Sequence, residues 1–264
     1  GGRWKEKSDG KGGRHGQGAV SETLQGWMKR HHVLHFTKDR SQTHVQYQVG
    51  DRPHMFVDIP PSLLNEFHTV FANTVGRGTE LGFMSECASL PVFPLFYDVD
   101  NPGVERKRMK TPLALAQTLH HTLKSIYPHK FLRIVCCGEN PDPHVPQNLH
   151  LHVPDLNVTI PKALQIRRAF IRDLSSSSDT NDVNWNKCVD EGILLTHKTL
   201  RMPFSHKSTK GVHVGRPYQL VCALDCEGVQ DKVAERAYLK NPVMLLKDAS
   251  IRTNDQVETA PQRS

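Results

Sequence analysis

Two aspartates end an apolar stretch of this chain. The stretch VFPLFYDVDN covers residues 92–101, and one valine separates Asp98 from Asp100. Alternate side chains of a β-strand point to the same face, with their Cα atoms roughly 6.5 Å apart. Carboxylates so placed could hold two Mg²⁺ or Mn²⁺ ions about 3.5–4 Å apart, as in two-metal catalysis. The alternative is a strand that runs out into solvent through a turn.

Two histidines occur in a second alternating stretch, NLHLHVP, at residues 148–154. His150 and His152 would share one strand face, while the leucines between and around them would face the other way. An imidazole there could donate a hydrogen bond to a phosphate oxygen, or it could bind zinc. The alternative is an ordinary solvated strand face.

A third acid and several basic residues follow in CVDEGILLTHKTLRMPFSHKS, residues 188–208. The acid is Asp190, and the basic side chains include Arg201 and Lys207. Arginine and lysine beside metal-binding carboxylates are suited to a triphosphate that lies between the two charge types. The alternative is a basic surface loop.

The composition agrees with a polyanionic partner inside a cell. The 264 residues carry a net charge of +7, which favours nucleic acid or nucleotides as partners. The six cysteines have no spacing typical of a disulfide framework, so we expect a reducing, intracellular setting. No run of 18 apolar residues occurs, so we expect no membrane partner. A zinc site at Cys222 and Cys226 is a weaker alternative to ordinary buried thiols.

The elements that must position these residues alternate between strands and helices. Helical periodicity or capping signals occur at 62–74, from Thr111-Pro112 onward, and from Pro161 onward, and strand patterns at 131–138 and 148–153. Several strand pairs have connections too short for a helical crossover, which predicts an α+β fold with a mainly antiparallel sheet flanked by helices. We expect a flexible linker at 1–18, at the edge of an excised piece, a core at 19–250 and a flexible tail at 251–264.

The order of these motifs resembles the catalytic core of the archaeo-eukaryotic primase superfamily, over about residues 30–225. The matching pieces are FYDVD with Asp98 and Asp100, NLHLHVP with His150, VDEG with Asp190, LRM with Arg201 and SHK with Lys207. The LRM motif is similar to the corresponding motif in the primase-polymerase and large-DNA-virus branch of the superfamily, which includes herpesvirus-like primases. Two positions depart from the family pattern: Asn148 stands where the family has serine, and Pro146 where many members have lysine.

The resemblance implies a primase or primase-polymerase that extends or starts primers on single-stranded DNA from NTPs or dNTPs. The core would divide into an N-terminal α/β part at about 19–90 and an RRM-like catalytic part at about 91–250. Asp98, Asp100 and Asp190 would hold two divalent ions, Mg²⁺ or Mn²⁺. The residues that would hold the triphosphate are Asn148, His150, Arg201 and Lys207.

The template would run over a basic surface through phosphate contacts that carry no sequence information. The candidate residues are Arg106, Lys107, Arg108, Lys110, Arg167, Arg168 and Arg172. An ordinary solvated helix face is the alternative for the three arginines from 167 to 172. The resemblance also implies a replicative helicase as partner, in the same chain or another, and a nucleus or viral replication site as location.

Two other functions use the same residues. The chain could be a nucleic-acid-binding module with weak or no catalysis, which the changes at Asn148 and Pro146 would favour. It could also be a metal-dependent nuclease or phosphoesterase that uses the acids and histidines. A hydrolase has no need for side chains that grip a triphosphate, so Arg201 and Lys207 discriminate against it.

Overall fold

The computed structural model describes residues 22–35, 42–47, 54–88, 90–100, 109–176, 183–196, 198–209 and 212–252. The linker expected at 1–18 lies outside these ranges, as do Arg106, Lys107 and Arg108. Most of the expected tail lies outside them as well, because the description ends at residue 252.

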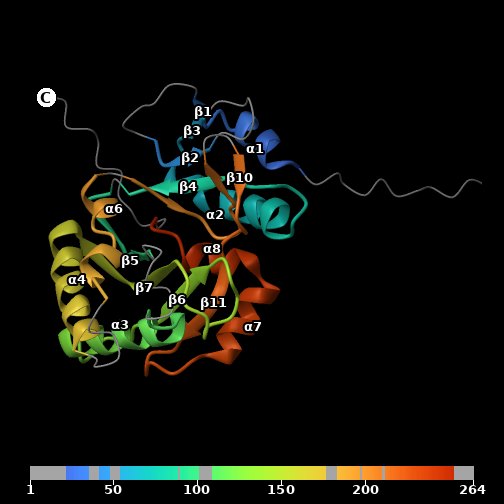
Figure 1. Cartoon of the computed structure of the whole chain (residues 1–264). Helices are drawn as coiled ribbons and strands as arrows, with labels where there is room; N and C mark the ends of the chain where they lie inside the picture. The colour runs from blue at the N-terminus through green and yellow to red at the C-terminus, as the bar shows by residue number, and fades with distance from the viewer. Residues whose placement is uncertain are drawn as a thin grey trace, which may run out of the picture.

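One sheet is built mainly from the N-terminal part of the chain, whose strands β1 to β4 lie in the upper part of Figure 1. It has five strands, all antiparallel. Its order is β1 (Leu34–His35), β3 (Met55–Val57), β2 (His44–Gln46), β4 (Met84–Cys87) and β8 (Thr199–Arg201). Apolar side chains of this sheet form a core with the helices α1 (Leu24–Arg30), α2 (Pro61–Phe71), η1 (Ala72–Gly76) and α8 (Pro242–Asp248).

A second antiparallel sheet has four strands. Its order is β11 (Gln219–Leu224), β6 (Ile134–Gly138), β7 (Leu149–Thr159) and β5 (Val92–Val99). The largest core of the protein lies between one face of this sheet and the helices α3 (Pro112–Ile126) and α4 (Ile160–Ser175). The other face packs partly against α7 (Lys232–Lys240) and α8. The predicted α+β class with mainly antiparallel sheets is therefore confirmed, although the strands divide into two sheets.

The remaining elements are short. The hairpin of β9 (Lys207–Thr209) and β10 (Val212–Val214) follows β8, and α5 (Trp185–Cys188) and α6 (Gly192–Leu195) lie between α4 and β8. None of the helices in the described ranges combines the length and the apolar character that crossing a membrane requires.

Local sequence explains the elements around β5 and β7. Thr111 caps α3 by accepting a hydrogen bond from the Ala114 amide at 3.3 Å, and Pro112 occupies the first turn. In β7 the leucines at 149 and 151 enter the core with α3 and α4. His150 and His152 alternate with them and are also buried, so the solvated face considered for this strand is not present.

The two parts expected at 19–90 and 91–250 are interlocked. Strand β8 comes from the later part but completes the first sheet by pairing with β4. Met202 and Leu246 likewise belong to the core that α1 and α2 form. Ile251 is fully buried, so the folded core extends beyond the expected end at residue 250.

A buried carboxylate attaches this C-terminal segment to the first sheet. Glu86 of β4 accepts hydrogen bonds from the Ser250 hydroxyl at 2.5 Å and the Ile251 amide at 3.0 Å. The Nε2 atom of His44 lies 3.7 Å from the same carboxylate. Burial alone would raise the pKa of Glu86, but His44 and the two hydrogen bonds outweigh it and lower the pKa to about 2.

We expect Glu86→Gln to lower the free energy of unfolding by about 2–3 kcal/mol near pH 7, because the folded state favours the ionised carboxyl. A lowered folded-state pKa contributes stability above the unfolded pKa, and that contribution disappears as the pH falls from about 4.5 to 2. Urea unfolding of both proteins should therefore show a difference that narrows in acid. The exposed Glu227→Gln variant serves as the control, and an equal loss in both variants would contradict the account.

Candidate active site

The three predicted acids meet where β5 ends. Val99 of β5 forms an antiparallel bridge with Val189, the Asp190 amide donates to the Asp98 carbonyl at 2.9 Å, and the Asp100 amide donates to the Cys188 carbonyl at 2.8 Å. This register sets Asp190 directly opposite Asp98, and opposite residues of an antiparallel pair share a face, with Cβ atoms about 4.5–5.5 Å apart. Asp100, the residue directly after β5, lies on that face as well because it follows Asp98 by two positions.

His150 lies on the other side of Asp98. It is paired with Asp98 in the register between β5 and β7, and its Nε2 atom lies 3.6 Å from Oδ1 of the carboxyl. Burial holds the pKa of His150 well below its ordinary value, and the nearby His152 and Arg201 act in the same direction. A neutral ring that can donate one N–H therefore stands beside the acids.

The acids repel one another and are poorly solvated. Burial raises the pKa of Asp98 to about 7, and the charges of Asp100 and Asp190 add to the increase. Burial and then Asp190 raise the pKa of Asp100 in the same way. The Oδ1 atom of Asp98 is buried with no hydrogen-bond partner in the described part of the chain. A divalent cation that prefers oxygen ligands would relieve each of these effects, so the residues fit the predicted metals.

The described residues contain no group of three or more His, Cys, Asp or Glu side chains that is already arranged to hold a metal ion. Asp190 also has other partners: its Oδ1 accepts from the Gly192 amide at 2.7 Å, and its Oδ2 lies 3.4 Å from Nζ of Lys198.

An arginine faces the acids from the first sheet. The guanidinium of Arg201, on β8, lies 3.6 Å above the centre of the Tyr218 ring and 3.1 Å from Oε1 of Glu139. The His150 ring meets the same tyrosine edge-on, with ring centres 4.5 Å apart. Tyr218 is buried, so one aromatic ring fixes both Arg201 and His150.

Two lysines add positive charge. The positive charge of Lys207, exposed on β9, partly offsets the increase in the pKa of Asp98 and Asp100. Lys198 has the same effect on the pKa of Asp100. Asn148 directly precedes β7, whose first residue pairs with Val99. The structure therefore gathers acids from β5 and residue 190 with basic side chains from β8 and β9, although these segments are far apart in sequence.

Comparison with known protein families shows which family this chain belongs to. Residues 43–224, more than half of the chain, match the family described as the C962R protein N-terminal AEP domain, where AEP denotes archaeo-eukaryotic primase. The chain belongs to the archaeo-eukaryotic primase superfamily. The match places it with the primase-polymerases of large DNA viruses, as the LRM motif predicted. No curated protein gave a significant match.

The primase-type core supports nucleotidyltransferase chemistry, and domains of this kind generally use divalent metals. The matched range contains all the residues predicted for the metals and the triphosphate. The two acids at the end of β5, the acid at 190 and the residues from 148 to 207 therefore lie inside the family domain.

Arg167 does not lie where the sequence placed it. It was expected on the exposed basic face of α4, but only 4% of it is accessible to solvent. Its guanidinium donates to the Val189 carbonyl at 2.7 Å and the Asn186 carbonyl at 2.7 Å, and lies 3.1 Å from Glu191. Arg167 therefore anchors the segment that carries Asp190 and is not available to bind DNA.

The other described template candidates lie in the helix layer. Arg168 and Arg172 are exposed on α4, and Lys110 lies just before α3. The Tyr97 hydroxyl donates to the Ala163 carbonyl of α4, so alternation turns the neighbouring Asp98 away from these helices. The structure thus places these three basic residues on the opposite side of the second sheet from the acids.

Sequence reasoning missed Tyr218 and Glu139, as well as the anchoring role of Arg167. Tyr218 directly precedes β11 and Glu139 directly follows β6. Because β6 and β11 are paired antiparallel, the two residues lie at the same end of this strand pair. No local pattern predicts that Arg201 reaches them from a different sheet. A buried basic residue in an amphipathic helix gives no periodic signal that separates it from its exposed neighbours.

We expect Arg167→Met to lower the free energy of unfolding by about 2–4 kcal/mol, because the substitution leaves buried carbonyl groups without donors. Arg168→Ala, one position along the same helix, should change stability by less than about 0.5 kcal/mol. Urea denaturation measures both. Equal effects of the two variants would show that Arg167 does not anchor the segment.

Asp98→Asn should stabilise the metal-free protein by about 2 kcal/mol at pH 8. The folded-state pKa of Asp98 is raised to about 7, so ionisation disfavours the folded state and stability falls as pH rises from about 4 to 7. The advantage of the variant should vanish near pH 4. Thermal unfolding across this range is the measurement, and a variant less stable than wild type at pH 8 would contradict it. Added Mn²⁺ should raise the Tm of wild type more than that of the variant.

Proposed function

We propose that this protein is a DNA-templated nucleotidyltransferase that makes or extends primers on single-stranded DNA from NTPs or dNTPs. One observation carries the proposal. Three carboxylates share a face at the end of β5, and Arg201 from the first sheet and Lys207 from the hairpin of β9 and β10 add positive charge beside that face. A bound nucleotide needs both charge types, because its metal ions and its triphosphate have opposite signs.

In this proposal Asp98, Asp100 and Asp190 hold the two divalent ions. Bound ions would lower the pKa of the primer 3′-hydroxyl and neutralise charge on the leaving pyrophosphate. Arg201 holds phosphate oxygens in a fixed position because Tyr218 and Glu139 restrict its guanidinium.

The remaining proposed contacts complete the triphosphate site. Lys207 supplies a mobile positive charge from the hairpin, and His150 donates a single N–H from a neutral ring. Asn148 can donate through its amide where the family has a serine hydroxyl. Together these residues offset the negative charge that grows during phosphoryl transfer.

The proposal extends to partners and location. The template is single-stranded DNA, and unwinding it requires a replicative helicase in the same chain or in another. The nucleus or a viral replication site is where such an enzyme would act. These partners and this location follow from the proposed activity.

The deciding experiment is nucleotide incorporation on a single-stranded template with Mg²⁺ or Mn²⁺, with and without a primer. We expect metal-dependent product that Asp98→Ala and Asp100→Ala abolish while template binding persists. Product without a primer identifies a primase, and product only with a primer identifies an extending polymerase. Template cleavage in place of extension would favour a nuclease, and intact template binding with no product would favour a binding module.

We expect Lys207→Ala to raise the KM for the nucleotide about tenfold or more, because it removes a charged contact to the triphosphate. Lys232→Ala, on the remote helix α7, is the matched control and should leave KM unchanged. Steady-state incorporation kinetics measure both. An unchanged KM for the Lys207 variant would remove this residue from the site.

A further inference from the structure

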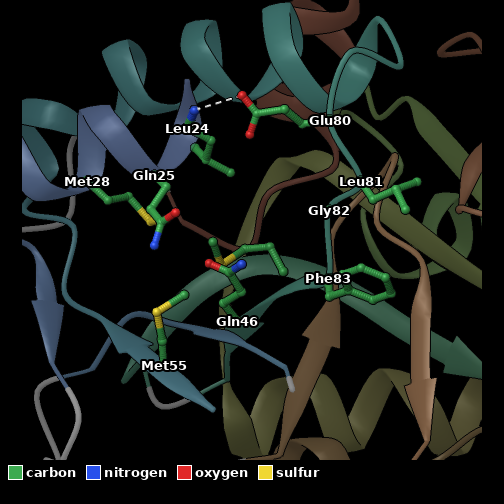
Figure 2. Close-up of a pocket in the computed structure, with 10 residues that line it drawn as sticks. Leu24, Gln25, Met28, Gln46, Met55, Glu80, Leu81, Gly82 and Phe83 are labelled. Carbon is green, nitrogen blue, oxygen red and sulfur yellow. Dashed lines mark hydrogen bonds between the residues drawn. The ribbon is translucent and has the colours of Figure 1, made fainter. Parts of the chain in front are cut away.

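A separate cavity lies on the first sheet, away from the acids. Its volume is about 450 Å³, within the range of ligand pockets. Figure 2 shows its three walls: Leu24, Gln25 and Met28 from α1, Gln46 and Met55 from the ends of β2 and β3, and residues 80–83. Gln46 pairs with both Met55 and Met84, so these three side chains share the sheet face that α1 covers.

The residues that line the cavity are unsuited to binding phosphate. The described residues that line the cavity include Glu80 but no lysine, arginine or histidine. Three of the lining residues are methionines; Met55 is partly exposed, whereas Met28 and Met84 are fully buried. A methionine side chain adapts to a flat, polarisable ring and makes favourable contacts with it. The cavity is therefore suited to an uncharged aromatic ligand rather than to the triphosphate that Arg201 and Lys207 would hold.

Two polar groups could orient such a ligand. Oε1 of Glu80 accepts a hydrogen bond from the Leu24 amide at 3.2 Å, which holds this carboxylate at the cavity (Figure 2). Oε1 of Gln46 is buried and has no hydrogen-bond partner among the described residues. Both groups offer acceptor oxygens, and the amino and imino groups on the edge of a nucleobase are matching donors.

One wall of the cavity is joined to the segment between Arg201 and Lys207. The His206 amide donates to the Gly82 carbonyl at 2.7 Å, and the Met84 amide donates to Oγ of Ser205 at 3.1 Å. The Phe83 ring packs against His206 and His213, with ring centres 5.8 and 5.6 Å apart, respectively. A base in the cavity would therefore lie against residues 80–83, which are hydrogen-bonded to the segment between the two proposed triphosphate contacts.

We propose that this cavity binds an unpaired nucleobase. The base packs against Met55, and its donor edge meets Gln46 and Glu80, while its sugar and phosphate stay outside. The base can come from single-stranded DNA or from a free nucleotide, since both present the same ring. The inference rests on the proposed function only in its choice of nucleic acid as the ligand class.

The test compares the binding of an oligodeoxyadenylate with that of a strand of equal length without bases, in the absence of metal and triphosphate. Gln46→Leu removes the acceptor at nearly constant volume, and Gln25→Trp narrows the cavity from an exposed position of α1. Gln165→Leu, exposed on α4, is the matched control. Both cavity variants should weaken binding of the base-containing strand about fivefold or more and leave the baseless strand unaffected.

The inference would be overturned if the two cavity variants bound oligodeoxyadenylate as tightly as the control variant does, and also bound AMP as tightly as the control variant does. A loss with AMP alone would support the cavity as a site for a free nucleotide, and a loss with the strand would support single-stranded DNA. Nucleotide incorporation is measured separately. Loss of the proposed activity with intact base binding would therefore refute the enzyme function and not the cavity.

Discussion

The antiparallel bridge between Val99 and Val189 is the contact on which the candidate site depends. It sets Asp190 opposite Asp98 and so completes a face with three carboxylates, which β5 alone could not form. Arg167 holds the bridged segment from the helix side through the Val189 carbonyl. Helix α4, in the core layer, thus fixes Asp190 on the opposite face of the sheet. The packing of this helix therefore also determines the geometry of the site.

Two buried carboxyls show how the surroundings decide between structural and chemical roles. Glu86 is surrounded by donors, so its pKa is lowered to about 2 and its charge joins the C-terminal segment to β4. Asp98 is buried and faces two other acids, and its Oδ1 has no hydrogen-bond partner among the described residues, so its pKa rises to about 7. The first carboxyl stabilises the fold as it stands. The charge of the second is disfavoured by its surroundings, and a perturbed pKa of this kind is typical of functional sites.

Local patterns in the sequence predicted the elements and the acid pair. Thr111-Pro112 marked the start of α3, and alternation grouped Asp98 with Asp100 on one strand face and His150 with His152 on another. The structure adds that Asp98 and His150 are paired across two neighbouring strands. Pairing between distant segments could not be predicted in this way, which is why the insertion of β8 into the first sheet and the stacking of Arg201 on Tyr218 were missed. The prediction that Arg167 is exposed was wrong because its buried partners are backbone carbonyls. Every residue has a carbonyl, so the sequence does not indicate which ones an arginine will bind.

The most direct test of the central claim is a crystal structure with Mn²⁺ and a non-hydrolysable nucleotide triphosphate, with the ions located by anomalous scattering. The account predicts two ions on the shared face, bound by Asp98, Asp100 and Asp190 and by phosphate oxygens, with Arg201 and Lys207 on the triphosphate. A nucleotide bound elsewhere, or ions that do not touch the three acids, would contradict it.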